Sequence, residues 1–219
     1  MKVISLGFTC YLKSLILRTT YASETDIFDW CNSFYFSKLI ESLEDNFCIG
    51  QNCIQSPLDV DKDKTVLYNI RYEFRIPHEQ CMETYKRRYE RFQNYKHTDT
   101  NYLFLRIVNM EGRYGKSSEE LYENYNDECY HRLMKFLPPK SRILLLIHKP
   151  LDDHVRQTIS KHFYVIENCI NPEYCFFGDK MSYATKIIQY YEECFQYIEN
   201  TFDTLDTNIL QRFIHNDRL

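Results

Sequence analysis

Cys10 is the residue whose type and position best suit nucleophilic chemistry. It follows a short apolar run, residues 2–6, and Gly7, and it begins a stretch in which apolar side chains recur at helical spacing. A thiol between the end of a strand and the start of a helix lies where backbone N–H groups stabilise its anion. The pattern therefore favours Cys10 over the other cysteines as a nucleophile. The alternative is that it is a small buried side chain.

His148 is a candidate general base for such a nucleophile. A cysteine hydrolase needs a histidine within hydrogen-bond reach of the thiol, and a third group that orients this histidine. His148 directly follows the predicted strand 143–147, at the same sheet edge as Cys10. A strand-end histidine that caps backbone groups is an equally good interpretation.

Arg106 lies near the end of the predicted strand 102–108, where it can serve a binding role. Its guanidinium can pair with Asp29 or hold an anionic substrate group through two parallel hydrogen bonds. The turn that contains Gly7 and Thr9 is expected at the same edge. These residues together predict a site for a phosphate or carboxylate group of a substrate.

Five blocks of this chain, among them Arg-Ile-Pro-His-Glu at residues 75–79, resemble in their order those of a known family. Ser-Leu-Gly-Phe-Thr-Cys at residues 5–10 and Phe-Asp-Trp at residues 28–30 resemble the opening signature of the DUF1796 family. That family is described as proposed papain-like cysteine peptidases. A basic helix at residues 85–92 and a strand at residues 103–106 that ends in arginine follow in the same order. The resemblance covers roughly residues 3–150.

This resemblance implies catalytic roles for three residues and an alternative fold. Cys10 would be the nucleophile, Asp29 a group that orients the base, and His78 the base itself, within Arg-Ile-Pro-His-Glu at residues 75–79. The family has His-Asp where this chain has His-Glu. A papain-like protein would have an α+β fold with a helical lobe and an antiparallel barrel. Asp29 can also be a structural acid that caps the segment after it.

Two other functions fit parts of the same pattern. A glycosyltransferase-like enzyme would bind a sugar nucleotide at the carboxyl ends of the strands, and Asp59 and Asp61 form the Asp-x-Asp pair that holds a divalent metal in such enzymes. The charged stretch 59–64 is also typical of a solvated loop. A hydrolase would need no cofactor and no metal. A non-catalytic binding module, in which Cys10 is only buried, is the third interpretation.

Four predicted strands, each separated from the next by helical patterns, position these residues. They lie near residues 2–6, 102–108, 143–147 and 163–167, and two of them are continuous apolar runs. Helices are expected over residues 10–18, 37–46, 81–96, 117–136, 151–162 and 183–202, and a strand or hairpin arm over 65–76. This order predicts one domain over residues 1–219, of the α/β class. Its mostly parallel sheet should have four to six strands with helices on both faces.

Composition narrows the choice of partners and compartment. The net charge of −4 gives no basic field for nucleic acid, and no apolar run is long enough to cross a membrane. The cysteine count of nine is odd, and no Cys-x-x-Cys pair or export signal occurs. We therefore expect reduced thiols and a cytoplasmic protein that acts on a peptide or a small molecule.

Overall fold

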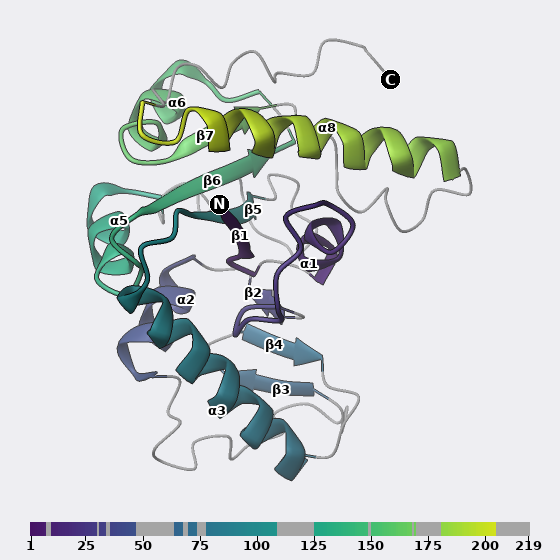
Figure 1. Ribbon diagram of the computed structural model, residues 1–219. Helices are drawn as coiled ribbons and strands as arrows, with labels where there is room; N and C mark the ends of the chain where they lie inside the picture. Colours follow the sequence, from purple (N-terminus) through teal and green to yellow (C-terminus); the bar gives the residue numbers. More distant parts are fainter. Residues whose placement is uncertain are drawn as a thin grey trace.

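The computed structural model places the predicted strands in one parallel sheet (Figure 1). It describes residues 1–7, 10–29, 31–33, 36–46, 64–67, 70–73, 78–108, 125–148, 150–167, 169 and 181–204. The strands are β1 (Lys2–Ser5), β5 (Tyr102–Val108), β6 (Ser141–Ile147) and β7 (Tyr164–Glu167), hydrogen-bonded in the order β1-β5-β6-β7. Every neighbouring pair is parallel, which confirms the predicted fold class and is unlike the alternative papain-like arrangement.

Apolar side chains on both faces of the strands explain why this sheet lies between helices. All seven residues of β5 are buried, and all of them except Arg106 are apolar or aromatic, as expected for a strand covered on both faces. In the parallel register, Val3 of β1 pairs with Leu103 of β5, which in turn pairs with Arg142 of β6. Alternate residues then point to opposite faces, and each face needs its own cover.

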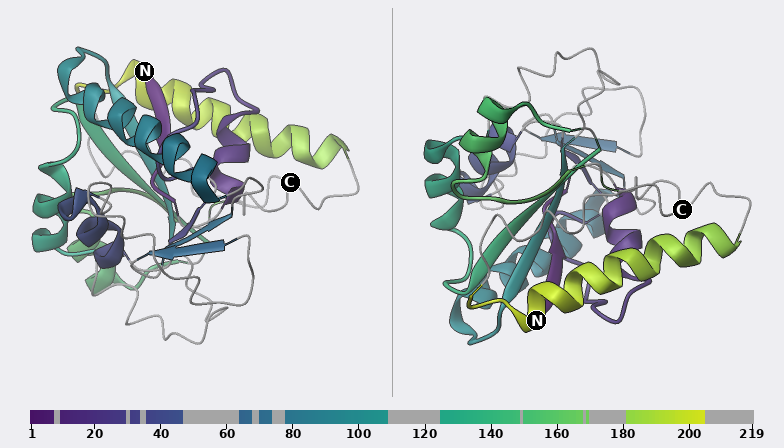
Figure 2. Two further views of the ribbon diagram at one scale, coloured as in Figure 1. Left: turned by 90° about the horizontal axis from the view of Figure 1, so that it is seen from below. Right: turned by 90° about the horizontal axis from the view of Figure 1, so that it is seen from above.

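Helices cover both faces, as predicted (Figure 2). On one face lie α1 (Cys10–Ile16) and α8 (Met181–Asn200). On the other lie α2 (Phe36–Glu44), α3 (His78–Asn94) with the short η2 (Tyr95–His97), α5 (Asp127–Met134) and α6 (Asp153–Ile159). None of the helices within the described ranges is long and apolar enough to span a membrane.

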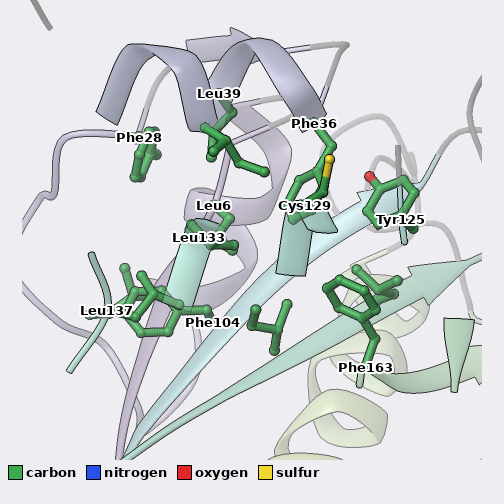
Figure 3. Close-up of a cluster of buried hydrophobic side chains, with 14 of the residues drawn as sticks. Leu6, Phe28, Phe36, Leu39, Phe104, Tyr125, Cys129, Leu133, Leu137 and Phe163 are labelled. Atoms are coloured by element: carbon green, nitrogen blue, oxygen red, sulfur yellow. The ribbon is translucent and has the colours of Figure 1, made fainter. Parts of the chain in front are cut away.

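The second of these faces carries an aromatic cluster at its centre (Figure 3). The rings of Phe36 and Tyr125 stack with their centroids 4.6 Å apart, and Phe163 meets both edge-on. Cys129 and Leu133 of α5 pack into the same cluster. These contacts hold α2 and α5 against the sheet, close to where β1 and β5 end.

A smaller antiparallel sheet lies beside the main one. Its strands are β2 (Cys31–Ser33), β4 (Ile70–Glu73) and β3 (Lys64–Leu67), in the order β2-β4-β3. The β3–β4 pair agrees with the hairpin arm expected over residues 65–76. The short strand β2, which begins directly after the Phe-Asp-Trp block, was not predicted.

Of the helix expected over residues 117–136, the structure confirms Asp127–Met134, while residues 117–124 lie outside the described part of the chain. Helix α5 begins only at Asp127, because Asn126 is extended and its side chain accepts a hydrogen bond from the Cys129 backbone N–H. Such a cap defines a helix start. Asn126 therefore interrupts the helical pattern that the apolar spacing indicated.

Candidate functional site

The end of β1 and the residues directly after it, Leu6 and Gly7, have a defined backbone conformation a few residues before Cys10. Gly7 has a φ of 75°, a conformation that glycine adopts without the steric penalty of a Cβ. Its backbone N–H donates to Ser5 Oγ at 3.0 Å, and the Leu6 N–H donates to the Leu105 carbonyl at 2.7 Å. The Ser-Leu-Gly block therefore has a direct structural reason, since each residue forms part of one tight turn.

Arg106 of β5 holds the same turn from the neighbouring strand. Its Nη1 donates to the Leu6 carbonyl at 2.9 Å, and its Nε donates to the Tyr125 hydroxyl at 2.7 Å. The guanidinium carbon also lies 5.4 Å from the centre of the Phe36 ring. With 0% of its surface exposed, Arg106 does not face solvent. Its predicted role in substrate binding stays a prediction.

Lys13 and Asp29 join α1 to the segment that covers the free edge of β1. Lys13 lies three residues after Cys10, and its Nζ contacts Asp29 Oδ2 at 2.9 Å in a buried ion pair. The same ammonium donates to the carbonyls of Ser23 and Glu24, and the Ser23 hydroxyl donates to the Val3 carbonyl of β1. We call residues 20–29 the edge segment.

The orienting role that the family resemblance implies for Asp29 stays a prediction, because the side chain of His78 is outside the described part of the structure. Its Oδ2 accepts hydrogen bonds from Lys13 and from the Asp26 backbone N–H at 2.6 Å. Burial raises the pKa of Asp29, because it outweighs the attraction of Lys13. Within the described part of the chain, no histidine contacts Asp29.

The basic helix α3 contacts the edge segment from the opposite side. Arg91 Nη1 donates to the Thr25 carbonyl at 2.6 Å, and its Nε pairs with Glu24 at 2.8 Å. Arg88 is partly buried, which lowers its pKa, while attraction from Asp29 opposes this change. The basic helix therefore contacts the edge segment, although the two are widely separated in the chain.

The position of Cys10 corresponds to a place where open α/β sheets bind ligands. After β1 the chain enters α1 on one face, whereas the first helix described after β5 is α5, on the other face. Adjacent parallel strands whose helices leave to opposite faces open a crevice at their carboxyl ends. Helix α1 has only seven residues, so its dipole adds less to this site than the sequence suggested.

His148 lies at the other end of the same sheet edge and contacts a different cysteine. Its Nδ1 is 3.4 Å from the Cys169 sulfur and 3.3 Å from the Cys169 carbonyl oxygen. Strand β6 is two positions from β1, a lateral separation of about 10 Å. Burial raises the pKa of the Cys169 thiol to about 12, so this cysteine is a neutral thiol at physiological pH.

Other predicted site residues fall partly or wholly outside the described residues. Cys10 and His78 are the first residues of α1 and α3, but their side chains are not described. Thr9, Asp59 and Asp61 lie outside the described residues altogether. The pairing of Cys10 with a histidine and the metal site at Asp59 and Asp61 therefore stay predictions.

Three further residues in or against the edge segment were not predicted: Lys13, Asp26 and Tyr95. Tyr95 donates its hydroxyl to Asp26 Oδ1 at 2.7 Å. A lysine within the apolar stretch 12–16 was a usable signal, because a charge on the buried face of a helix needs a partner. No comparable signal singled out Asp26 or Tyr95.

A cavity of about 460 Å³ lies at the opposite end of β1. Its walls include Lys2, Tyr21, Glu24, Arg91 and Tyr95. Because Lys2 begins the strand and Cys10 follows its other end, this hollow is separate from the expected catalytic edge. Parallel sheets bind ligands at the carboxyl ends of their strands, so we place the candidate site at the Cys10 end of β1 and not at this cavity.

Comparison of the chain with family models, curated proteins and solved structures gives no significant match.

Proposed function

We propose that this protein is a cysteine-dependent hydrolase that cleaves an amide or ester bond, with Cys10 as its nucleophile. The observation that carries the proposal is the convergence of separate sequence blocks on the backbone around Cys10. Arg106 binds the carbonyl of Leu6 before it, and the Lys13–Asp29 pair anchors the helix that it begins. Burying such charged groups costs several kcal/mol unless they are paired, so an arrangement of this kind supports a site with a demanding geometry.

The proposed reaction proceeds in two steps. A base removes the proton from the Cys10 thiol, and the thiolate adds to the carbonyl carbon of the substrate. The bond to the leaving amine or alcohol breaks as that group takes up the proton, which leaves a thioester on Cys10. Water then cleaves the thioester, releases a carboxylic acid and restores the thiol.

His78 is our proposed base, because the family resemblance indicates it and His148 is already bound to Cys169. Asp29 acts in this proposal on the position of α1 through Lys13, rather than on the histidine. The substrate is a peptide or a small molecule. Cys129, Cys169 and Cys194 form no disulfide, which supports a reducing, cytoplasmic setting.

Trapping the acyl intermediate tests this proposal. The protein is incubated with p-nitrophenyl acetate at neutral pH, and the modified residues are identified by intact-mass and peptide-mapping mass spectrometry. We expect one rapidly added acetyl group on Cys10, which Cys10→Ala abolishes. The matched control Cys129→Ala changes a buried thiol elsewhere and should be acetylated like the wild type. Equal acetylation of the wild type and Cys10→Ala, spread over lysines, would refute the nucleophile.

A further inference from the structure

Two buried aspartates, Asp26 and Asp29, lie within a single turn of the edge segment. The Asp29 backbone N–H donates to the Asp26 carbonyl at 3.2 Å, and the Asp26 N–H donates to Asp29 Oδ2 at 2.6 Å. Asp26 is 0% and Asp29 is 2% exposed. Both side chains are therefore held in the interior by the fold of this turn.

Hydrogen bonds to the two carboxyls are incomplete. Tyr95 donates to Asp26 Oδ1, and Lys13 donates to Asp29 Oδ2. Asp26 Oδ2 and Asp29 Oδ1 are buried and have no hydrogen-bond partner among the described residues. A buried carboxylate oxygen without a donor is costly, and a proton on the carboxyl changes that oxygen from an acceptor into a donor.

The charges around this pair do not balance two ionised carboxyls. Lys13 of α1 is the only fully buried cation among the described residues that contacts the pair. Arg88 and Arg91 of α3 approach from the opposite side, but both are partly exposed and Arg91 is bound to Glu24. Their attraction is therefore screened more than the repulsion between the two aspartates.

We propose that Asp26 and Asp29 form an acid pair that takes up a single proton as the pH falls below neutrality, and that this proton fastens the edge segment to α1 and η2. With one proton bound, Asp29 and Lys13 remain as a neutral ion pair, and Asp26 is uncharged. Without it, two like charges repel each other in the interior. The inference concerns folding and stands whether or not Cys10 is a nucleophile.

The pKa values of both carboxyls are raised, as expected for two acids buried in one turn. Burial raises the pKa of Asp26 to about 6, and repulsion from Asp29 adds to the rise, while Tyr95, Lys13 and Arg91 oppose it. The pKa of Asp29 is raised as well. Since the two carboxyls interact, the titration midpoint is a property of the pair, with the proton on Asp26 while Asp29 stays paired with Lys13. A folded-state pKa above the unfolded value stabilises the fold at low pH, and this contribution is lost as the pH rises through about 6.

The test compares Asp26→Asn with Asp203→Asn, a matched change at an exposed aspartate after α8. Asparagine mimics the protonated acid and cannot titrate. The free energy of unfolding is measured with urea at pH 7.5 and at pH 5.5. On going from pH 7.5 to pH 5.5, protonation of the pair should raise the folded-to-unfolded ratio about fourfold. This increase should be present in the wild type and Asp203→Asn, and absent from Asp26→Asn. The same pH dependence in all three proteins would overturn the proposal.

If Asp26→Asn does not fold, a direct titration of the wild-type protein tests whether the two aspartates share one proton. Carboxyl ¹³C resonances of the wild-type protein are followed by NMR as the pH is changed. We expect the Asp26 and Asp29 signals to move together, with a midpoint near 6. Two independent midpoints near the usual value for aspartate, about 3.9, would contradict an acid pair that shares one proton.

Discussion

Asp29 beside β1 and Glu167 at the end of β7 are both buried acids paired with a basic side chain, and their pKa values shift in opposite directions. Glu167 accepts from Arg156 Nε and Nη2 at 2.6 and 3.0 Å, and from the Leu151 N–H at 2.8 Å, and its pKa is lowered. Asp29 has one oxygen without a described donor, and its pKa is raised. Burial raises the pKa of Asp29 by more than Lys13 and the Asp26 N–H lower it, whereas the donors to Glu167 outweigh its burial.

The β1 end and the β7 end of the main sheet also differ in the residues that their buried polar side chains contact. Near β7, Arg156 and Glu167 fix the start of α6, and His148 contacts the protonated thiol of Cys169. Near β1, Arg106 and Lys13 hold the backbone on both sides of Cys10. Both oxygens of Glu167 accept hydrogen bonds, whereas Asp26 and Asp29 near β1 each have one buried oxygen for which the described residues supply no donor. Groups of that kind are typical of functional sites.

Lys13→Met should have the largest effect on stability, because it leaves two buried carboxyls without their buried cation. We expect a loss of about 3–5 kcal/mol in the free energy of unfolding at pH 7.5, measured by urea denaturation. The loss should shrink at pH 5.5, since protonation then neutralises the pair. Lys86→Met, at an exposed position of α3, is the control and should be near neutral. Wild-type stability of Lys13→Met at pH 7.5 would show that the ion pair does not anchor α1.

Glu167→Gln should have a smaller effect with the opposite pH dependence. The amide cannot accept from Arg156 and Leu151 as the carboxylate does, so we expect a loss of about 1–3 kcal/mol at neutral pH. Because the folded-state pKa of Glu167 is lowered, its contribution is present above the unfolded value and is lost as the pH falls. Glu193→Gln, on the exposed side of α8, is the control. A loss that grows on acidification would contradict this account of the junction.

Cys169 should be the least reactive toward an alkylating reagent, since its thiol is buried and protonated. We expect no alkylation by iodoacetamide in the native protein at pH 8, and full alkylation after unfolding, as measured by peptide mapping. Cys194, which is 0% exposed, should behave in the same way. Native labelling of Cys169 at the rate of an accessible thiol would mean that the β7 end is reactive too.

The main sheet and most helices followed from the sequence because their signals are local. Continuous apolar runs gave the strands that contain Leu103 and Leu144, and intervening helices required parallel pairing. The place of Cys10 at the start of α1 followed from the same pattern. The partners of the predicted side chains did not follow, because they are set by packing between distant segments. Neither the periodicity nor the spacing of residues indicated that Asp29 binds Lys13, or that His148 meets Cys169.

The rate at which iodoacetamide alkylates Cys10, followed from pH 5 to pH 9, tests the central claim most directly. An activated nucleophile should react faster than the other cysteines, with a midpoint well below 8.5, the usual pKa of a cysteine thiol. Cys10→Ser should remove this reaction and leave the slow labelling of the other thiols unchanged. A Cys10 that reacts only after unfolding, or with a midpoint at or above 8.5, would contradict the proposed hydrolase.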